Sequence, residues 1–367
     1  MQKIKDIYIH LNGKFVERTD IIKGMLTSLI AGQHMLLIGP PGTAKSELVG
    51  ELAKCINGGN YFHWLLSQFS TPDELFGPVS LQKLEQGVYE RVTQNKLPEA
   101  HIAFADEIFK ANSAILNNLL TIINERLFHN NGQPVKVPLV TLFGASNEYP
   151  EEENLEALFD RFILRYEIKP ISEDSNFLKM MQDSPNSTAA PELTIDELKQ
   201  IQVDASKLIV DKNIFELYTQ LKVELEEEGV NPSDRRWKQS IKVVKAAAAM
   251  RGANSVDPKD LNILKHILWM EPEQIKTVAS IVAKHTVDKF TEMVEKLMSE
   301  AEEIAHNALQ AASTEAGTEA NKKLKGLAAE MKDIRKQFPS KENEIDTKVG
   351  VIKQKNQAVL NTCLGLE

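Results

Sequence analysis

The sequence is poor in cysteine, with two among its 367 residues, Cys55 and Cys363, which lie far apart. A disulfide framework or a zinc site needs more cysteines at closer spacing, so neither is supported. Scarce cysteine is typical of a reducing compartment, and we expect a cytoplasmic protein. No run of 18 apolar residues exists, and the N-terminus has no signal-peptide core, so we expect no membrane span.

The chain also lacks an excess of basic residues. Lys and Arg number 43 against 52 Asp and Glu, which gives a formal net charge of −9. This balance, together with the lack of a stripe of basic and aromatic residues, argues against nucleic acid as the main partner. The length allows two or three domains with a sizeable hydrophobic core.

What the sequence does contain is a glycine-bearing loop between an apolar run at 34–38 and an amphipathic segment from residue 47. The loop is Gly39-Pro40-Pro41-Gly42-Thr43-Ala44-Lys45-Ser46. This order predicts a buried strand, a loop and a helix. Main-chain N–H groups of such a loop and the positive end of the helix dipole favour a polyphosphate. The alternative is a turn that binds nothing, but the Lys-Ser pair in register favours a nucleotide.

We expect this phosphate loop and Glu47, in the first helical turn, to contact the nucleotide. Lys45 would reach the β- and γ-phosphates, and the Ser46 hydroxyl would help to hold Mg²⁺. Ala44 stands where the strict pattern has its second glycine. We expect Ala44 to lie at the start of the helix, where it needs no positive φ and costs little.

Carboxylates and an amide follow two further apolar runs. Asp106 and Glu107 end the run that starts at His101, and Asn147 ends the run that starts at Val140. Open α/β sheets bind ligands at the carboxyl ends of their strands. Asp106 would hold Mg²⁺ through its water shell, and Glu107 would act as general base on the attacking water. Asn147 would hydrogen-bond the γ-phosphate or that water, with a plain turn cap as the alternative.

The rest of the first half predicts a mixture of elements. Residues 1–33 are expected to be helical with a break at Asn12-Gly13. The further expectations are a strand at 61–66, a brief helix at 71–77, a small projecting hairpin at 81–92, and an amphipathic helix at 112–126.

The second half predicts helices throughout. A capping box begins at Thr194, and further helices are expected at 238–250 and 261–269. From Phe290 to Ala311 apolar residues alternate spacings of three and four, which is typical of a heptad seam. Similar runs follow Ala316-Gly317 and Pro339-Ser340, so three long antiparallel helices forming an arm are the simplest interpretation.

Taken together and in order, these motifs resemble the AAA+ ATPases of the MoxR type. The resemblance depends on the phosphate loop, Asp106-Glu107, Asn147 and Leu158-Phe159-Asp160-Arg161-Phe162. The Ala-Lys-Ser end of the loop and Ser233-Asp234-Arg235-Arg236-Trp237 look most like the RavA branch. The segment 81–92 is similar to the insertion in helix 2 that marks this clade. The resemblance covers roughly residues 10 to 270.

The resemblance implies an α/β fold, with an AAA+ core of a parallel sheet flanked by helices at 1–172 and an all-helical lid at 173–272. The helical arm inferred from the heptad seam takes up the C-terminal part, 273–367. It implies that Asn147 is the sensor 1 residue and that Arg161 is an arginine finger for a neighbouring subunit.

Further arginines take their expected roles from the same resemblance. Arg235 is similar to sensor 2, which contacts phosphate from the lid, although Arg236 stands one residue away and the assignment stays open. Arg126 and Arg165 are lesser candidates for the subunit boundary.

The resemblance also implies hexameric rings that bind ATP and Mg²⁺ between subunits and remodel partner proteins, often with a partner bearing a von Willebrand factor A domain. In the RavA branch the arm carries a further small domain, and the sequence leaves no room for a β-rich one. Two alternatives stay open, a nucleic-acid motor or clamp loader and a nucleotide-gated scaffold that scarcely hydrolyses ATP. A GTPase is disfavoured, since the segment starting Asn95-Lys96 lacks the aspartate of a guanine-reading motif.

Overall fold

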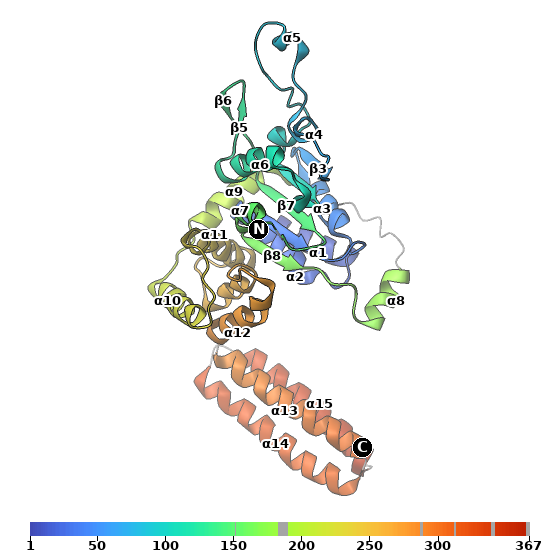
Figure 1. Cartoon of the computed structure of the whole chain (residues 1–367). Coiled ribbons are helices and arrows are strands. Elements are labelled where there is room, and N and C mark those ends of the chain that lie inside the picture. Colours follow the sequence, from blue (N-terminus) through green and yellow to red (C-terminus); the bar gives the residue numbers. More distant parts are fainter. Residues whose placement is uncertain (151, 183–189, 287–288, 312, 339–341, 365–367) are drawn as a thin grey trace. The chain divides into compact units, whose positions relative to one another are not determined.

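A computed structural model describes residues 1–150, 152–182, 190–286, 289–311, 313–338 and 342–364 (Figure 1). The chain divides into two compact units, Met1–Lys284 and His285–Glu367. Most of helix α12 (Ile275–Thr286) therefore belongs to the first unit. The predicted boundaries at residues 172 and 272 stay predictions.

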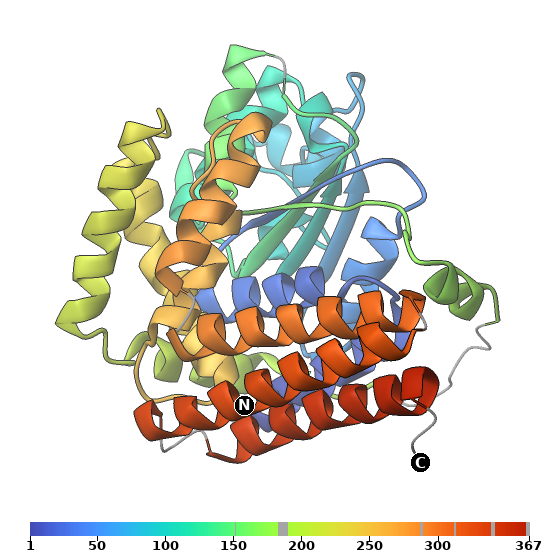
Figure 2. The same ribbon diagram turned by 90° about the horizontal axis from the view of Figure 1, so that it is seen from below.

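The first unit contains a five-stranded parallel sheet in the order β3-β4-β7-β1-β8. The strands are β1 (Met35–Ile38), β3 (Tyr61–Leu65), β4 (Ile102–Asp106), β7 (Thr141–Ser146) and β8 (Leu164–Glu167). Strands β1 and β7 are buried along their whole length, as expected for the middle of a sheet covered on both faces. Figure 2 shows the strands side by side, with helices of the lid region to one side. The predicted α/β fold is confirmed, and the strand β8 is one that the sequence interpretation missed.

Helices surround this sheet. They are α1 (Gln2–Lys14), α2 (Thr19–Ala31), α3 (Lys45–Lys54), α4 (Pro72–Phe76), α5 (Leu81–Leu84), α6 (Ser113–Glu125), α7 (Glu153–Arg161) and α8 (Asp174–Gln182), with 3₁₀ turns η1 (Leu97–Glu99) and η2 (Ile108–Lys110). The predicted break at Asn12-Gly13 is wrong, because α1 continues to Lys14. Buried Ile4, Ile7 and Leu11 hold one face of α1 on the core, so the helix passes through this glycine.

The segment 81–92 projects from the first unit but is not the predicted hairpin (Figure 1). Its ends are joined by a single antiparallel bridge, Val79 to Arg91, and its tip is the short helix α5. Arg91 closes the base, since its Nη1 donates to the Gly77 carbonyl at 2.6 Å. A true hairpin is formed instead by β5 (Leu127–Asn130) and β6 (Gln133–Lys136).

Residues 190–286, called the lid region below, form helices and one short strand, β9 (Leu193–Thr194), which pairs with β2 (Ile56–Asn57). Its elements are α9 (Ile195–Ser206), α10 (Lys212–Glu227), α11 (Asp234–Arg251), η3 (Pro258–His266), η4 (Pro272–Gln274) and α12. The predicted capping box at Thr194 and Glu197 is confirmed. The predicted α-helix at 261–269 is instead the 3₁₀ segment η3, which starts earlier because Asp257 caps it and Pro258 takes its first position.

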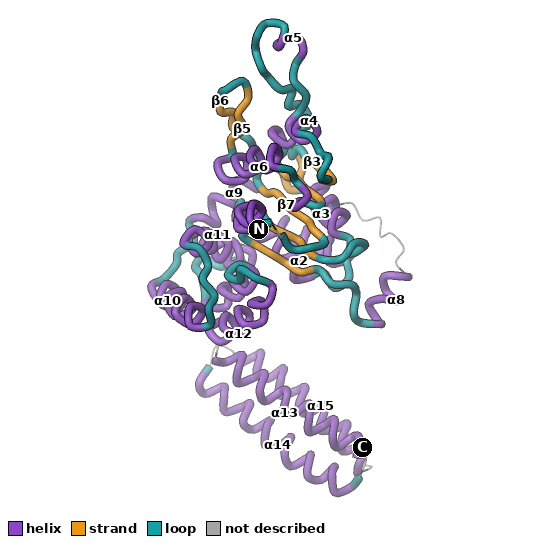
Figure 3. The backbone as a smooth tube through the Cα atoms, viewed as in Figure 1, coloured by secondary structure: helices purple, strands orange, loops and turns teal. Residues whose placement is uncertain are grey.

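The second unit consists, in its described part, of α13 (Lys289–Ala311), α14 (Thr314–Gln337) and α15 (Glu342–Leu364), which Figure 3 draws as three long helices. They bury one shared apolar seam, as predicted. Helix α14 passes through Ala316-Gly317, because Ser313 caps it three residues earlier. Pro339, Ser340 and the side chain of Phe290 lie outside the described residues. Among the described helices, none has both the length and the apolar character that a membrane crossing needs.

Candidate functional site

The phosphate loop leaves the carboxyl end of β1, between β7 and β8. The Gly39 N–H donates to the Ser146 carbonyl at 3.0 Å. A β-carbon at Gly39 would lie 2.1 Å from the Ile168 carbonyl oxygen, so only glycine fits at this close approach of two backbone segments. The sheet therefore fixes the start of the loop.

Ala44 is left-handed, with φ +64° and ψ +26°. Our prediction that it needs no positive φ is wrong, because helix α3 begins one residue later, at Lys45, and Ala44 is its N-cap. The left-handed turn joins the loop to the helix at a cost of about 1 kcal/mol for a residue with a β-carbon. A strained residue that lines a cavity is a feature typical of functional loops.

Lys45 is 7% exposed, and its ammonium donates to the loop and to Asn147. Its Nζ donates to the carbonyls of Gly39 at 2.6 Å and Pro40 at 3.0 Å, and to Asn147 Oδ1 at 3.1 Å. Burial lowers the pKa of Lys45, opposed by the nearby carboxylates of Asp106 and Glu107. These acceptors hold the charged group beside the loop, where an anion can replace the carbonyl oxygens.

Asn147 connects Lys45 with Glu107. The Asn147 Nδ2 donates to Glu107 Oε1 at 2.5 Å, while Glu107 Oε2 lies 3.4 Å from the Lys110 ammonium. Glu107 itself is left-handed, with φ +52°, and its N–H donates to Asp106 Oδ1 at 3.1 Å. This sharp turn directly after β4 orients both carboxylates at the end of the strand.

These residues line one cavity of about 360 Å³. The lining residues are Pro41, Gly42, Thr43, Ala44, Lys45, Ser46, Glu47, Asp106, Glu107 and Asn147. Gly39 and Pro40 do not line it, but their carbonyl oxygens accept hydrogen bonds from the Lys45 ammonium. The structure thus brings together residues that lie about a hundred positions apart in the sequence, at the edge of the sheet where the sequence analysis expected them.

The donor atoms in this cavity fit Mg²⁺. The Ser46 hydroxyl and the Asp106 carboxylate both line it, and Mg²⁺ prefers oxygen ligands and keeps several waters. Among the described residues, no group of three or more His, Cys, Asp or Glu side chains could hold a metal ion by itself. A magnesium ion at Ser46 and Asp106 would therefore need phosphate oxygens as additional ligands.

Arg161 and Arg235 do not line this cavity. They meet at Asn124, near the end of α6, whose Oδ1 accepts from Arg161 Nε at 2.8 Å and from Arg235 Nη2 at 2.7 Å. Burial and the charge of Arg161 lower the pKa of Arg235. Two positively charged guanidinium groups donate to the same amide oxygen here, and an approaching anion would stabilise this pair of charges.

Arg236 has a different environment from Arg235. It is fully buried, and its guanidinium donates to the carbonyls of Phe162 at 2.9 Å, Ile163 at 2.9 Å and Ile267 at 2.7 Å. Its Nε also donates to Asp160 Oδ1 at 3.2 Å. Burial lowers the pKa of Arg236 to about 10. A side chain enclosed in this way cannot contact a phosphate, so Arg235 is the candidate that the geometry leaves.

Arg165 and Arg126 also serve the interior. Arg165 is 0% exposed, donates to the Trp269 carbonyl at 2.8 Å, and its guanidinium carbon lies 3.8 Å from the centre of the Phe159 ring. Arg126 donates to main-chain carbonyls including Gly32 at 3.1 Å, and burial lowers its pKa to about 10. The prediction of a subunit-boundary role is wrong for Arg165, and the guanidinium of Arg126 is engaged within its own chain.

Asn124 is the residue that sequence reasoning missed. It lies 37 residues from Arg161 and 111 from Arg235, so no local motif connects the three. Its only signal was its place on the polar face of an amphipathic helix whose buried face includes Ile122 and Ile123.

Comparisons with known proteins identify relatives of this chain. A sequence model described as the MoxR domain in the MoxR-vWA-beta-propeller ternary systems matches residues 2–205, and one for an AAA lid domain matches residues 213–282. The chain is 42% identical over 285 residues to an uncharacterised protein of Methanocaldococcus jannaschii, covering 77% of this chain and 75% of that protein. It is 25% identical over 278 residues to the chaperone MoxR1 of Mycobacterium tuberculosis, covering 69% and 72%.

A solved structure has the same fold. The crystal structure of a candidate ATPase from Cytophaga hutchinsonii matches with a TM-score of 0.64 at 18% identity, covering 78% of this chain and 94% of that one. At this identity the likeness shows the architecture alone.

Proposed function

Because this chain belongs to the MoxR family of AAA+ ATPases, we propose that it binds ATP with Mg²⁺ in the phosphate-loop cavity and hydrolyses it. The observation that carries the proposal is the hydrogen-bonded series Lys45–Asn147–Glu107 around one cavity that Ser46 and Asp106 also line. A cationic anchor, a carboxylate base and oxygen ligands for Mg²⁺ are what phosphoryl transfer to water requires.

Each side chain has a task in this proposal. Ser46 and Asp106 would hold Mg²⁺, which would supply positive charge next to the phosphates. Lys45 exchanges its carbonyl acceptors for phosphate oxygens, and the N–H groups at the start of α3 add the positive end of the helix dipole. Asn147 orients Glu107 through Oε1, so that the carboxylate can take a proton from the attacking water.

We further propose that Arg161 and Arg235 complete the cavity of a neighbouring copy. Both lie outside the cavity of their own chain, and Asn124 holds them together. If Arg161 reaches the nucleotide of the next subunit, Arg235 approaches the same phosphates from its place beside it. Such a shared site implies a ring, which we expect to be hexameric, and it makes hydrolysis depend on assembly.

The biological role that we propose is chaperone-like remodelling of partner proteins. The relative from Mycobacterium tuberculosis is named a chaperone, and the matching family model describes systems that include a vWA component. We therefore propose a partner with a von Willebrand factor A domain. The closer assignment to the RavA branch stays a prediction that rests on the Ala-Lys-Ser loop end and the segment around Arg235.

The variant Glu107→Gln tests the proposal. Removing the base should lower phosphate release by on the order of 10²-fold or more while ATP binding persists. Glu216→Gln, on α10 and outside the cavity, is the matched control and should turn over like the parent chain. Normal turnover by Glu107→Gln would show that the base is wrongly assigned. Weak phosphate release by the parent chain itself would favour the nucleotide-gated scaffold, and stimulation by DNA would favour the nucleic-acid motor.

A further inference from the structure

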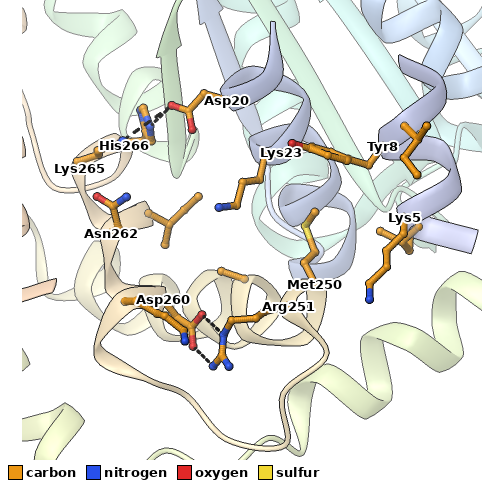
Figure 4. A pocket seen from close by; sticks show the side chains of 15 residues that line it. Lys5, Tyr8, Asp20, Lys23, Met250, Arg251, Asp260, Asn262, Lys265 and His266 are labelled. Atoms are coloured by element: carbon orange, nitrogen blue, oxygen red, sulfur yellow. Dashed lines mark hydrogen bonds and ion pairs between the residues drawn. The ribbon is translucent and has the colours of Figure 1, made fainter. Parts of the chain in front are cut away.

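A second, larger cavity of about 630 Å³ lies in the first unit, away from the phosphate loop (Figure 4). Helices α1 and α2 form one wall, and the end of α11 together with η3 forms the other. It shares no lining residue with the phosphate-loop cavity. Its volume lies in the range of cavities that hold small organic ligands.

Positive charge dominates the lining of this cavity. The basic residues are Lys5, Lys23, Arg251, Lys259 and Lys265, and the carboxylates are Asp20 and Asp260. Burial lowers the pKa of His266, opposed by its hydrogen bond to Asp20. Five cationic side chains and two carboxylates thus line the cavity, and Lys259 also lies 3.7 Å from Asp257, which does not line it.

The two carboxylates already have partners. Asp260 accepts from Arg251 Nη2 at 2.8 Å and from Arg251 Nε at 3.0 Å. Asp20 accepts from His266 Nε2 at 3.0 Å and lies 4.0 Å from the Lys265 ammonium. The hydrogen bond from His266 lowers the pKa of Asp20, and the charges of Lys265 and of Lys23, on the same helix α2, contribute to this shift.

Lys5 and Lys23 are the remaining basic residues of the cavity lining. Neither ammonium has a carboxylate oxygen within 4.0 Å in the part of the chain that the structure describes. Figure 4 shows the Lys23 side chain reaching from α2 into the space between the two walls, and the Lys5 side chain extending from α1. Both lysines are exposed to solvent, and an ammonium group that borders a cavity can donate to an anion that enters it.

Apolar groups fill the rest of the lining. Tyr8 from α1, Met250 from α11 and Ile263 from η3 border the space around the lysines. Met250 is held in place, since its sulfur lies 3.1 Å from the Thr27 hydroxyl. Cations beside an apolar wall select molecules that carry both a negative group and a hydrophobic body.

We propose that this cavity binds a small organic anion, with its charged group at the Lys23 ammonium and its apolar body against Met250 and Ile263. Helix α2 leads into β1 and the phosphate loop, while α11 begins beside Arg235. A molecule bound here joins the element that precedes the phosphate loop to the helix that carries Arg235. The cavity is an effector site that fixes the lid region on the core.

Binding of 8-anilinonaphthalene-1-sulfonate to the full chain, followed by fluorescence without nucleotide, tests the proposal. This probe has an apolar ring body and one sulfonate. N-phenyl-1-naphthylamine, which has the same rings and no charge, is the matched ligand. Lys23→Glu reverses the charge inside the cavity, and Lys212→Glu makes the same change at an exposed lysine of α10.

We expect the sulfonate to bind the parent chain at one site and to bind Lys23→Glu roughly tenfold or more weakly. Lys212→Glu should bind within about twofold of the parent, because an exposed charge elsewhere acts weakly. The uncharged probe should bind the parent roughly tenfold more weakly than the sulfonate. Thermal unfolding verifies that each variant is folded, and Lys23→Gln replaces Lys23→Glu if the latter is not.

Three results would overturn the proposal. The first is equal affinity of the sulfonate for the parent and the Lys23 variant. The second is equal affinity of the parent for the charged and uncharged probes. The third is loss of sulfonate binding in Lys45→Ala, which would place the probe in the phosphate-loop cavity instead.

Discussion

Two pairs of arginines in this molecule come from the same short segments and have opposite environments. Arg161 and Arg235 meet at Asn124 on the outside, whereas Arg165 and Arg236 are fully buried. Arg161 and Arg165 are four residues apart in the sequence, and Arg235 and Arg236 are adjacent. The buried pair binds main-chain carbonyls that close α7 against the lid region, and the outer pair has its guanidinium groups at one amide oxygen.

The difference shows that arginines close together in the sequence can have different roles, one pair in the packing of the interior and the other as accessible charges. Arg236 binds Asp160 and the carbonyl of Phe162, the two residues that flank Arg161 in the chain. The buried arginine therefore fixes the position of the outer one. We infer that the buried pair determines stability and geometry and that the outer pair determines activity, and the following variants separate these roles.

The largest effect should come from Arg236→Ala. It removes a buried guanidinium and leaves Asp160 and several carbonyls without their donor, at a cost of about 5 kcal/mol in unfolding free energy. Thermal or denaturant unfolding measures the loss. Arg235→Ala, the same change one residue earlier, should alter stability little. Equal destabilisation by both variants would remove the distinction between the pairs.

Arg161→Ala should act on the reaction rather than on the fold. Loss of a charge that stabilises the transition state should lower phosphate release roughly 10³-fold, about 4 kcal/mol, while ATP binding and the unfolding midpoint stay near the parent values. The specific activity of the parent chain should fall on dilution, as subunits separate. A parent chain whose specific activity is the same at every concentration would contradict a shared site.

Asn124→Ala should have the smallest effect of the three. It removes the acceptor that holds both outer arginines but leaves their charges, so phosphate release should fall about tenfold, near 1.4 kcal/mol. Asn118→Ala, on the same helix and half-buried, is the matched control and should be neutral. An Asn124→Ala variant with full activity would mean that the arginines need no such orientation.

The sequence predicted the phosphate-loop cavity well, because each of its parts follows an apolar strand and parallel strands end at one edge. Ala44 is the exception, since its left-handed backbone follows from where the helix starts, which one sequence does not reveal. Strand β8 was missed because Arg165 interrupts its apolar pattern. That arginine is buried only because distant carbonyls such as Trp269 receive it.

The arrangement of the arginines was the least predictable part. Resemblance supplied Arg161 and left Arg235 and Arg236 as alternatives, since both lie in the first turn of the same helix. Only the tertiary structure shows that Arg236 points inward and that Asn124 unites the other two. Contacts between segments 37 and 111 residues apart leave no periodic trace in a sequence.

A subunit-mixing experiment tests the shared site most directly. Lys45→Ala lacks its own nucleotide anchor but keeps Arg161, and Arg161→Ala lacks the finger but keeps Lys45. Each variant alone should release almost no phosphate. Mixed oligomers should recover activity, because some interfaces then combine an intact Lys45 with an intact Arg161 from the neighbour. Mixed oligomers that stay as inactive as either variant alone would contradict the account.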